Sequence, residues 1–291
     1  MKNTSRPVKN KKPLRQRLAG LTANGLGILI AFAFLAPMAW VALSSLKPAA
    51  EAVQPPLPPW PTTGVSIDTY RALDNFGAGL QRHTYNSMIV SVGTALTTVL
   101  VSTLAGYGFS RFRFRGKSVF FIIIMMTMMV PFQSILTPLF LLLTKLGLQN
   151  SLLGLIFVYT TLQLPFSVFM MRNSFDAVPL DIEEAARIDG CGTFGILTRI
   201  MLHLTLPGIV TVAIFAFFTS WNEFLAALVF LTSTESQTLP VIIAMVRYGN
   251  FGSINWSAVQ AGVTVMMIPC LIIFLALQRF YVRGLTSGAV K

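Results

Sequence analysis

Long apolar runs separated by short polar segments dominate the chain. Two stretches, residues 118–144 and 248–278, contain no Asp, Glu, Lys or Arg at all. An apolar helix needs roughly 20 residues to cross the hydrocarbon of a bilayer, and backbone amides inside lipid must bond within their own helix. The pattern therefore predicts an all-α membrane protein with six transmembrane helices, over residues 25–46, 87–109, 119–143, 152–171, 204–231 and 258–278.

The composition excludes a water-soluble fold. Hydrophobic residues make up 54% of the 291 residues and charged residues 11%, whereas a typical soluble domain carries about 25% charged residues. The two cysteines, Cys191 and Cys270, are expected in a loop and inside a span, so they imply no disulfide framework. Prolines inside the runs are expected to kink or interrupt the helices, namely Pro131, Pro138, Pro165, Pro207 and Pro269.

The first apolar run follows a basic tail, as the apolar segment of a signal peptide does. Residues 25–46 form a longer run than the ~7–15 apolar residues of a cleavable signal. They therefore predict an uncleaved first span, even though Ala50-Glu51-Ala52 resembles a cleavage site.

Basic residues indicate the orientation, because cytoplasmic loops of membrane proteins retain Lys and Arg. With the N-terminus inside, the outer side receives only Lys47, Arg71, Arg82, Lys145 and Arg247 of the 22 Lys and Arg residues. Both termini are therefore predicted to be cytoplasmic. The net charge of +12 is therefore explained by basic residues on the cytoplasmic side of the membrane, and it does not indicate nucleic-acid binding. The basic residues Arg111, Arg113, Arg115 and Lys117 are expected to anchor the chain at anionic lipid.

The expected spans divide the chain into five parts. These are a basic cytoplasmic tail (1–24), the first transmembrane helix (25–46), an extracytoplasmic proline-rich loop with one short helix (47–85), a core of five helices (86–279) and a C-terminal cytoplasmic tail (280–291). Within the core, residues 172–206 form a long polar loop on the cytoplasmic side.

This cytoplasmic loop is polar and yet built to be helical. Asp181 follows Pro179 as an N-cap type of residue and Glu184 stands in the capping-box position, so a two-turn helix is expected over residues 182–189. Gly190 and Gly192 are expected to end it in left-handed conformations, and Thr193 to cap a second helix that leads into the fifth span. The loop is either a docking knob for a soluble partner or a turn packed on its own bundle.

Six positions of the loop have a fixed spacing. Glu184-Ala185-Ala186 is followed after three residues by Gly190, and nine residues later by Ile200 and Leu202, which resembles the EAA loop of ABC importer permeases. Asn86-Ser87, residues 220–225 (SWNEFL) and residues 283–291 (RGLTSGAVK) resemble the maltose-type carbohydrate permeases. The resemblance covers about residues 47–291. His203 departs from it, because the family usually has proline there.

The resemblance implies a type I ABC importer permease of a bacterial cytoplasmic membrane. It implies that the loop is a coupling helix seated in a cleft of an ATPase, with Glu183, Glu184, Ala185, Ala186, Asp189 and Gly190 as the coupling residues. It also implies ABC ATPase subunits, a second homologous permease and an extracytoplasmic solute-binding protein as partners. The implied solute is a sugar or oligosaccharide, with a glycerophosphodiester or a polyol as the alternative.

Glu223 is the only clearly intramembrane acid, and ionisable groups at such depth usually face protein or water. Together with Trp221 and Asn222 it is expected to line a translocation path, and Gln133 and Gln163 are further candidates. The competing interpretation is a packing or gating contact with the companion permease.

No nucleotide, metal or catalytic site is expected in this chain. Residues 115–118 (RGKS) end like a phosphate-binding loop, but Arg111 occupies the place of its first glycine. His83 and His203 have no ligand-type neighbours at suitable spacing. The chain is thus expected to bind no cofactor, ATP and Mg²⁺ being used by the partner ATPase. Two alternatives are less favoured. An ion-coupled secondary transporter would need several intramembrane charges and inverted repeats. A membrane-embedded enzyme would need a cluster of catalytic residues at one depth.

Overall fold

The structure is a computed structural model, and it describes residues 14–48, 51, 58, 60–248 and 256–287. In this part of the chain every regular element is a helix. The longer helices are α1 (Leu14–Ser44), α3 (Leu80–Arg111), α4 (Lys117–Met126), α5 (Phe132–Lys145), α6 (Leu152–Asp176), α10 (Leu206–Asn222), α12 (Leu239–Tyr248) and α13 (Trp256–Ser287). The shorter ones are α2 (Asp68–Asp74), α7 (Leu180–Ile188), α8 (Thr193–Ile196), α9 (Leu202–Leu204) and α11 (Leu225–Phe230), with 3-10 turns η2 (Thr127–Met129) and η4 (Thr234–Ser236) and a π-helical turn η3 (Leu197–Met201).

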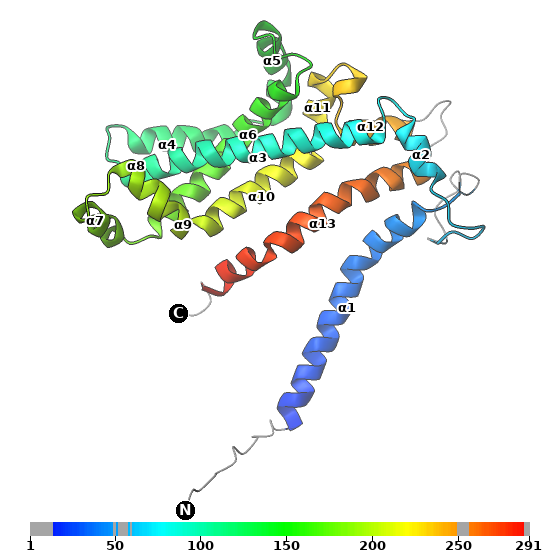
Figure 1. Ribbon diagram of the computed structural model, residues 1–291, viewed down its shortest axis with the longest axis horizontal. Coiled ribbons are helices and arrows are strands. Elements are labelled where there is room, and N and C mark those ends of the chain that lie inside the picture. The colour runs from blue at the N-terminus through cyan, green and yellow to red at the C-terminus, as the bar shows by residue number, and fades with distance from the viewer. Residues whose placement is uncertain (1–13, 49–50, 52–57, 59, 249–255, 288–291) are drawn as a thin grey trace, which may run out of the picture.

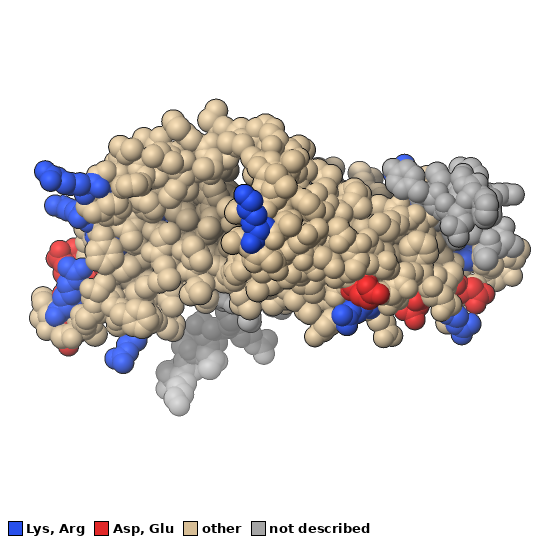
Figure 2. Space-filling view, turned by 90° about the horizontal axis from the view of Figure 1, so that it is seen from above, with Lys and Arg blue, Asp and Glu red and all other residues tan. Residues whose placement is uncertain are grey.

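Helix α3 is the central element of an elongated bundle (Figure 1). It packs mainly against α6 and α10, while α13 runs alongside α10 and contacts α12, α2 and α1. Helices α7 and α8 lie at one end of the bundle, which we call the α7 end, and α2 and α12 lie at the other, the α12 end. Charged side chains gather mainly at these two ends, with a wide, almost uncharged face between them (Figure 2). The distribution is that expected of a protein whose middle lies in lipid.

Four of the six predicted spans are continuous helices that are long and apolar enough to cross a membrane. They lie in α1, α3, α6 and α13. The other two are helix pairs bent by 103° and 77°, so the described residues contain up to six spans if each pair is one span. The chain is therefore a multi-pass membrane protein, as predicted, but two of its spans are not single straight helices.

The predicted span over residues 119–143 is interrupted before Pro131, as its prolines predicted. Helix α4 continues as the 3-10 turn η2, which ends at Met129, and Val130 is extended. Helix α5 then starts at Phe132 after a bend of 103°. Proline lacks the N–H that would continue the helix and pushes the preceding residue out of the helical region. The interruption that the prolines predicted is thus realised at this position.

The predicted span over residues 204–231 is bent near Pro207, as its proline predicted, and is interrupted again at Glu223, which was not predicted. The chain turns by 77° near Thr205, and α10 begins at Leu206 with Pro207 in its first turn, where proline is well tolerated. Helix α10 ends at Asn222, Glu223 is extended, and the short α11 follows. The turn lies two residues after His203, the residue that departs from the family pattern, at Thr205, whose hydroxyl donates to the Met201 carbonyl over 2.8 Å.

The predicted outer loop contains one short helix, α2, as expected from its amphipathic stretch. Before it, the carboxylate of Glu51 accepts hydrogen bonds from Thr63 and Thr62, and the hydrogen bond from the Thr63 side chain is the main reason why the pKa of Glu51 falls to about 2.

The predicted tails are partly helical, since α1 already begins at Leu14 and α13 continues to Ser287. The rest of both tails, residues 1–13 and 288–291, lies outside the described residues.

The contact between α3 and α6 is unusually close near the α7 end. A Cβ placed on Gly106 would lie 2.6 Å from the Cβ of Met171 and 2.9 Å from the backbone nitrogen of Arg172. Only glycine permits this approach, and small residues serve the same purpose at helix contacts in membranes generally. Gly106 therefore fixes how closely the two helices lie beside each other.

Candidate coupling helix and central cavity

The short helix α7 has the length that the sequence predicts, but it starts earlier. It runs from Leu180 to Ile188 with Pro179 before it, and no side chain in the described part of the chain caps its start. The predicted capping box with Asp181 as N-cap is therefore wrong, because the helix already includes Asp181 in its first turn. There its acidic group lies near the positive end of the helix dipole.

The turn after α7 depends on one glycine. Gly190 has a φ of +83°, which confirms the predicted left-handed conformation. Gly192 has a φ of −72°, so the same prediction for Gly192 is wrong. Thr193 is the first residue of α8 rather than its cap, and Gly192 occupies the N-cap position. The turn therefore contains one left-handed residue, Gly190, followed two residues later by the extended Gly192.

The two faces of α7 have opposite surroundings. Glu183 and Ala186, three residues apart, are buried on the side of the bundle, where Ala186 belongs to an apolar cluster with Phe175 and Ile196. The remaining predicted coupling residues, Glu184, Ala185, Asp189 and Gly190, are exposed. Next to them Ile188 and Phe194 expose 86% and 74% of their surface. One face of α7 is thus held by the chain itself, while the other presents acidic and apolar groups outward.

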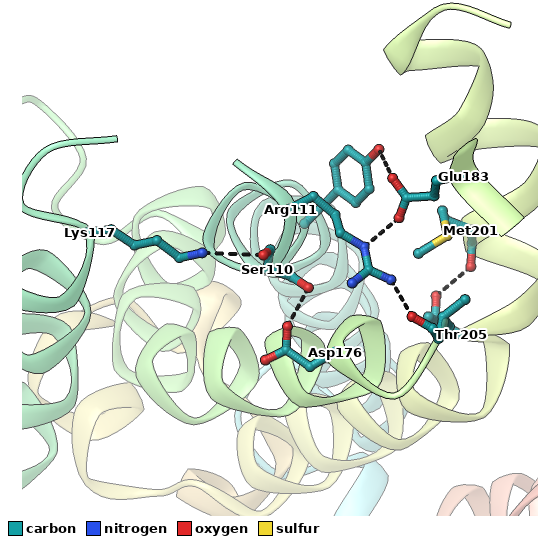
Figure 3. A network of polar contacts seen from close by, with 9 residues as sticks. Ser110, Arg111, Lys117, Asp176, Glu183, Met201 and Thr205 are labelled. Carbon is teal, nitrogen blue, oxygen red and sulfur yellow. Dashed lines mark hydrogen bonds and ion pairs between the residues drawn. The ribbon is translucent and has the colours of Figure 1, made fainter. Parts of the chain in front are cut away.

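Glu183 is held by a buried ion pair that the spacing in sequence did not suggest (Figure 3). The Nε of Arg111, the last residue of α3, donates to Oε1 of Glu183, and both side chains are almost completely buried. The hydroxyl of Tyr107 donates to Oε2 over 3.3 Å. The Nη2 of Arg111 donates to the Val178 carbonyl over 2.7 Å. The prediction that Arg111 is a lipid anchor is therefore wrong, since its side chain turns inward, whereas Arg113 and Arg115 are exposed.

A second set of polar contacts surrounds this ion pair. Lys117 donates to the carbonyl of Ser110 over 3.2 Å (Figure 3). It also donates to the Phe112 carbonyl over 3.2 Å, so it satisfies carbonyls at the end of α3 that lack a helical partner. The Ser110 hydroxyl donates to Asp176 at the end of α6. Asp176 also lies 3.5 Å from Arg172. The ends of α3 and α6 are thus joined to each other as well as to α7.

A cavity of about 340 Å³ lies in the middle of the bundle. Its walls come from α3, α6, α10 and the break between α4 and α5, and they combine apolar with hydroxyl, amide and carboxylate groups. The lining residues are Thr94, Thr127, Met128, Val130, Phe132, Tyr159, Leu162, Gln163, Ala216, Thr219, Ser220 and Glu223. The hydroxyl of Thr94 is buried without a hydrogen-bond partner among the described residues. Polar side chains therefore lie beside apolar ones around the cavity.

Glu223 lies at the break between α10 and α11, and its carboxylate is already engaged. It accepts hydrogen bonds from the backbone N–H groups of Leu225, Ala226 and Ala227 over 2.9 to 3.4 Å. It also accepts one from the hydroxyl of Tyr159 on α6. The carboxylate thus caps the first turn of α11, where N–H groups otherwise lack partners. In the structure the Glu223 carboxylate therefore stabilises the start of α11 after the break that follows α10.

Only one other predicted path residue lies on this cavity, namely Gln163. Trp221 is completely buried, stacks on Phe217 with ring centroids 5.7 Å apart and donates to the Met266 carbonyl over 3.1 Å. Asn222 lines a separate cavity of about 410 Å³ between α10 and α13. Gln133 is exposed and is not among the lining residues. The structure therefore brings Glu223 and Gln163 together, and it adds Tyr159, which the sequence analysis did not single out.

At the α12 end, polar side chains of α3 hold the segment between α11 and α12. The Asn86 amide donates to the carbonyls of Glu235 and Gln237 over 2.7 and 3.0 Å. The Ser87 hydroxyl accepts the N–H of Leu239 over 2.8 Å, and the ring of His83 lies 2.9 Å from the Gln237 carbonyl. His83 is thus occupied by backbone contacts. No group of three possible metal ligands occurs among the described residues.

Comparison with known proteins agrees with this architecture. Residues 98–287 match the family described as the binding-protein-dependent transport system inner membrane component. The probable ABC transporter permease protein YurM of Bacillus subtilis (strain 168) is 32% identical over 287 residues, which cover 96% of this chain and 92% of YurM. The trehalose/maltose transport system permease protein MalG of Thermococcus litoralis is 34% identical over 265 residues, which cover 91% of this chain and 94% of MalG.

The fold is also found in a solved structure. A bacterial ABC transporter involved in the import of the acidic polysaccharide alginate includes a chain that superposes with a TM-score of 0.76 at 23% identity, covering 94% of this chain and 100% of that chain. With a family match over most of the chain and relatives of nearly equal length, this protein belongs to the binding-protein-dependent transport system inner membrane components.

Proposed function

We propose that the chain is a translocation subunit of an ATP-driven, binding-protein-dependent importer for a sugar or oligosaccharide. The similar MalG is named a trehalose/maltose permease, and 34% identity over nearly the whole chain supports a solute of the same class. Its partners are two ABC ATPase subunits, a second homologous permease and an extracytoplasmic binding protein. The chain has no catalytic site of its own, and the ATPase subunits bind Mg²⁺ and hydrolyse ATP.

The observation that carries this proposal is the arrangement of α7. Its inner face is fixed by Glu183 and Ala186, while Glu184, Ala185 and Asp189 face outward beside the apolar side chains of Ile188 and Phe194. An exposed apolar group on a helix that is anchored from behind suits a contact with a folded partner. The α7 end then lies in the cytoplasm with both chain termini, and α2 and α12 lie outside.

The cavity beside Glu223 and Gln163 is proposed as part of the translocation path. Its hydroxyl and amide groups suit the hydroxyl groups of a sugar, and its volume lies at the lower end of the roughly 300–1,000 Å³ of small-molecule pockets. Glu223 contributes by keeping α11 and Tyr159 in place. Trp221 contributes by packing α10 on α13.

The docking role is tested with two substitutions on α7 and its turn. Glu184→Lys reverses a charge on the outer face, and Gly190→Asp places a side chain on a residue with a φ of +83°. Both are expected to leave the chain inserted and to weaken ATPase binding and stimulation. The matched controls are Gly192→Asp, at a φ of −72° with open space around it, and Asp74→Lys at the α12 end. ATPase binding that is unchanged in both test variants would contradict the docking role.

The energy source and the solute are tested with the complete complex in vesicles. Uptake should need both ATP and the ATPase subunits, and uptake that persists without the ATPase subunits would favour an ion-coupled carrier. Binding of a panel of sugars, polyols and glycerophosphodiesters to the partner binding protein separates the solute classes. A binding protein that takes only non-carbohydrate solutes would refute the sugar assignment alone.

A further inference from the structure

We propose that Arg111 is a positioning residue for energy coupling, because it fixes α7 to the end of α3 and makes the two helices move as one body. The proposal rests on the proposed docking function of α7. It differs from that function in naming the helix that receives the displacement and the residue that transmits it.

Arg111 contacts both the link between α6 and α7 and the helix α7 itself. Helix α6 ends at Asp176 and α7 begins at Leu180, so residues 177–179 form a short connection between them. Arg111 donates from one nitrogen to the carbonyl of Val178 in this connection and from another to Glu183 in α7. The connection therefore cannot act as a free hinge while both contacts persist. Without them α7 would be joined to the bundle by this link, by the turn to α8, by the single hydrogen bond from Tyr107 to Glu183 and by apolar contacts of Ala186.

The chemistry of the ion pair between Arg111 and Glu183 indicates that it fixes the position of α7 rather than adding much to the stability of the fold. Arg111 and Glu183 have 7% and 3% of their side-chain surface exposed. A buried ion pair adds little net stability, because removing both charges from water offsets their attraction. The planar guanidinium instead fixes the direction of two hydrogen bonds at once, which a Lys ammonium does not do. Tyr107, donating to the second oxygen of Glu183, orients the carboxylate from α3 as well.

Helix α3 is suited to carry a displacement across the molecule. Its sequence contains no proline, whereas α1, α6 and α13 each contain one, and sharp kinks in helices occur mostly at proline. At its other end Asn86 and Ser87 hold the backbone between residues 235 and 239. A shift of α7 that moves α3 therefore reaches the segment that precedes α12. The same helix links the ATPase side to the opposite face.

The first experiment compares Arg111→Gln with Arg113→Gln in the complete complex in vesicles. Both remove one positive charge from the same segment, but Arg113 is exposed. For Arg111→Gln we expect retained ATPase binding and ATP hydrolysis, with at least about tenfold fewer solute molecules moved per ATP, since hydrogen bonds to charged groups are each worth about one tenfold step or more. Arg111→Lys should recover only part of this ratio. Arg113→Gln should keep the ratio of the unsubstituted protein.

The second experiment measures directly whether α7 and the end of α3 stay at a fixed distance. Spin labels are attached to cysteines replacing Leu180 at the start of α7 and Arg115 beyond α3, both exposed, in a chain without Cys191 and Cys270. In the unsubstituted background the distance between the labels should stay the same when ATP binds. With Arg111→Gln the distance should change or become broadly distributed. A distance that changes with ATP in the unsubstituted background would overturn the proposal, as would a normal transport ratio in Arg111→Gln.

A folding defect is separated from a coupling defect by a double variant. Arg111→Met with Glu183→Met removes both buried charges, and such replacements commonly fold well. The assembled double variant is expected to keep a low transport ratio, because the contact to Val178 is lost, and a normal ratio would overturn the role of Arg111. Failure of the unsubstituted complex to bind ATPase or to import solute with ATP would instead refute the proposed function itself.

Discussion

The contact at Gly106 offers a quantitative test of how α3 is seated on α6. Gly106→Ala places a Cβ 2.6 Å from the Met171 Cβ and 2.9 Å from the Arg172 nitrogen. Carbon atoms pack best at about 3.5–4.0 Å, so the two helices must separate by roughly 1 Å. Neither neighbour is the end of a flexible side chain. Overpacking of this kind costs about 1–3 kcal/mol, and it would also displace Arg111, five residues further along α3.

Gly93→Ala is the matched control, because the atom that its Cβ meets at 2.6 Å is the terminal Cδ1 of Ile156, which can rotate away. Both variants gain the same helix propensity, about 1 kcal/mol for alanine over glycine. The difference between them therefore isolates the contact with α6. Detergent-solubilised protein is unfolded with increasing SDS, and Gly106→Ala should be the less stable by about 1–3 kcal/mol. Equal stability of the two variants would refute the reasoning.

Two further substitutions test the polar contacts. Glu223→Ala removes the cap of α11 and should destabilise the protein by about 2 kcal/mol, while Tyr159→Phe, which removes one of the four donors to this carboxylate, should cost about 1 kcal/mol. Unfolding in SDS measures both, and a raised KM for solute with unchanged stability in Glu223→Ala would instead identify the carboxylate as a solute ligand. Asn86→Ala leaves the carbonyls of Glu235 and Gln237 without the Asn86 amide donor and should raise protease sensitivity of the segment before α12, whereas the exposed neighbour Tyr85→Ala should not. Equal protease sensitivity of the two variants would contradict this role of Asn86.

Local features of the chain were predictable from the sequence alone. Membrane spans follow from the length of apolar runs, because a buried backbone in lipid must be helical whatever its neighbours are. The positive φ of Gly190 and the interruption at Pro131 follow from the covalent structure of single residues. For the same reason the all-helical class and the short helix in loop 172–206 could be predicted without any knowledge of packing. Helix starts were less predictable, as Pro179 rather than Asp181 precedes α7.

What the sequence could not determine depends on contacts between distant segments. Arg111 and Glu183 are 72 residues apart. The basic composition of the segment around Arg111 predicted a lipid anchor, and only the fold shows that the Arg111 guanidinium points inward to Glu183. Tyr159 and Glu223 are 64 residues apart, so the hydrogen bond between Tyr159 and this carboxylate was visible only once α6 and α10 lay together. Trp221 and Glu223 stand two residues apart in one motif, but one packs against α13 and the other faces the cavity. Hydropathy and turn chemistry act within a few residues, whereas the direction of each polar side chain was decided by the partner that tertiary packing brought within hydrogen-bonding distance.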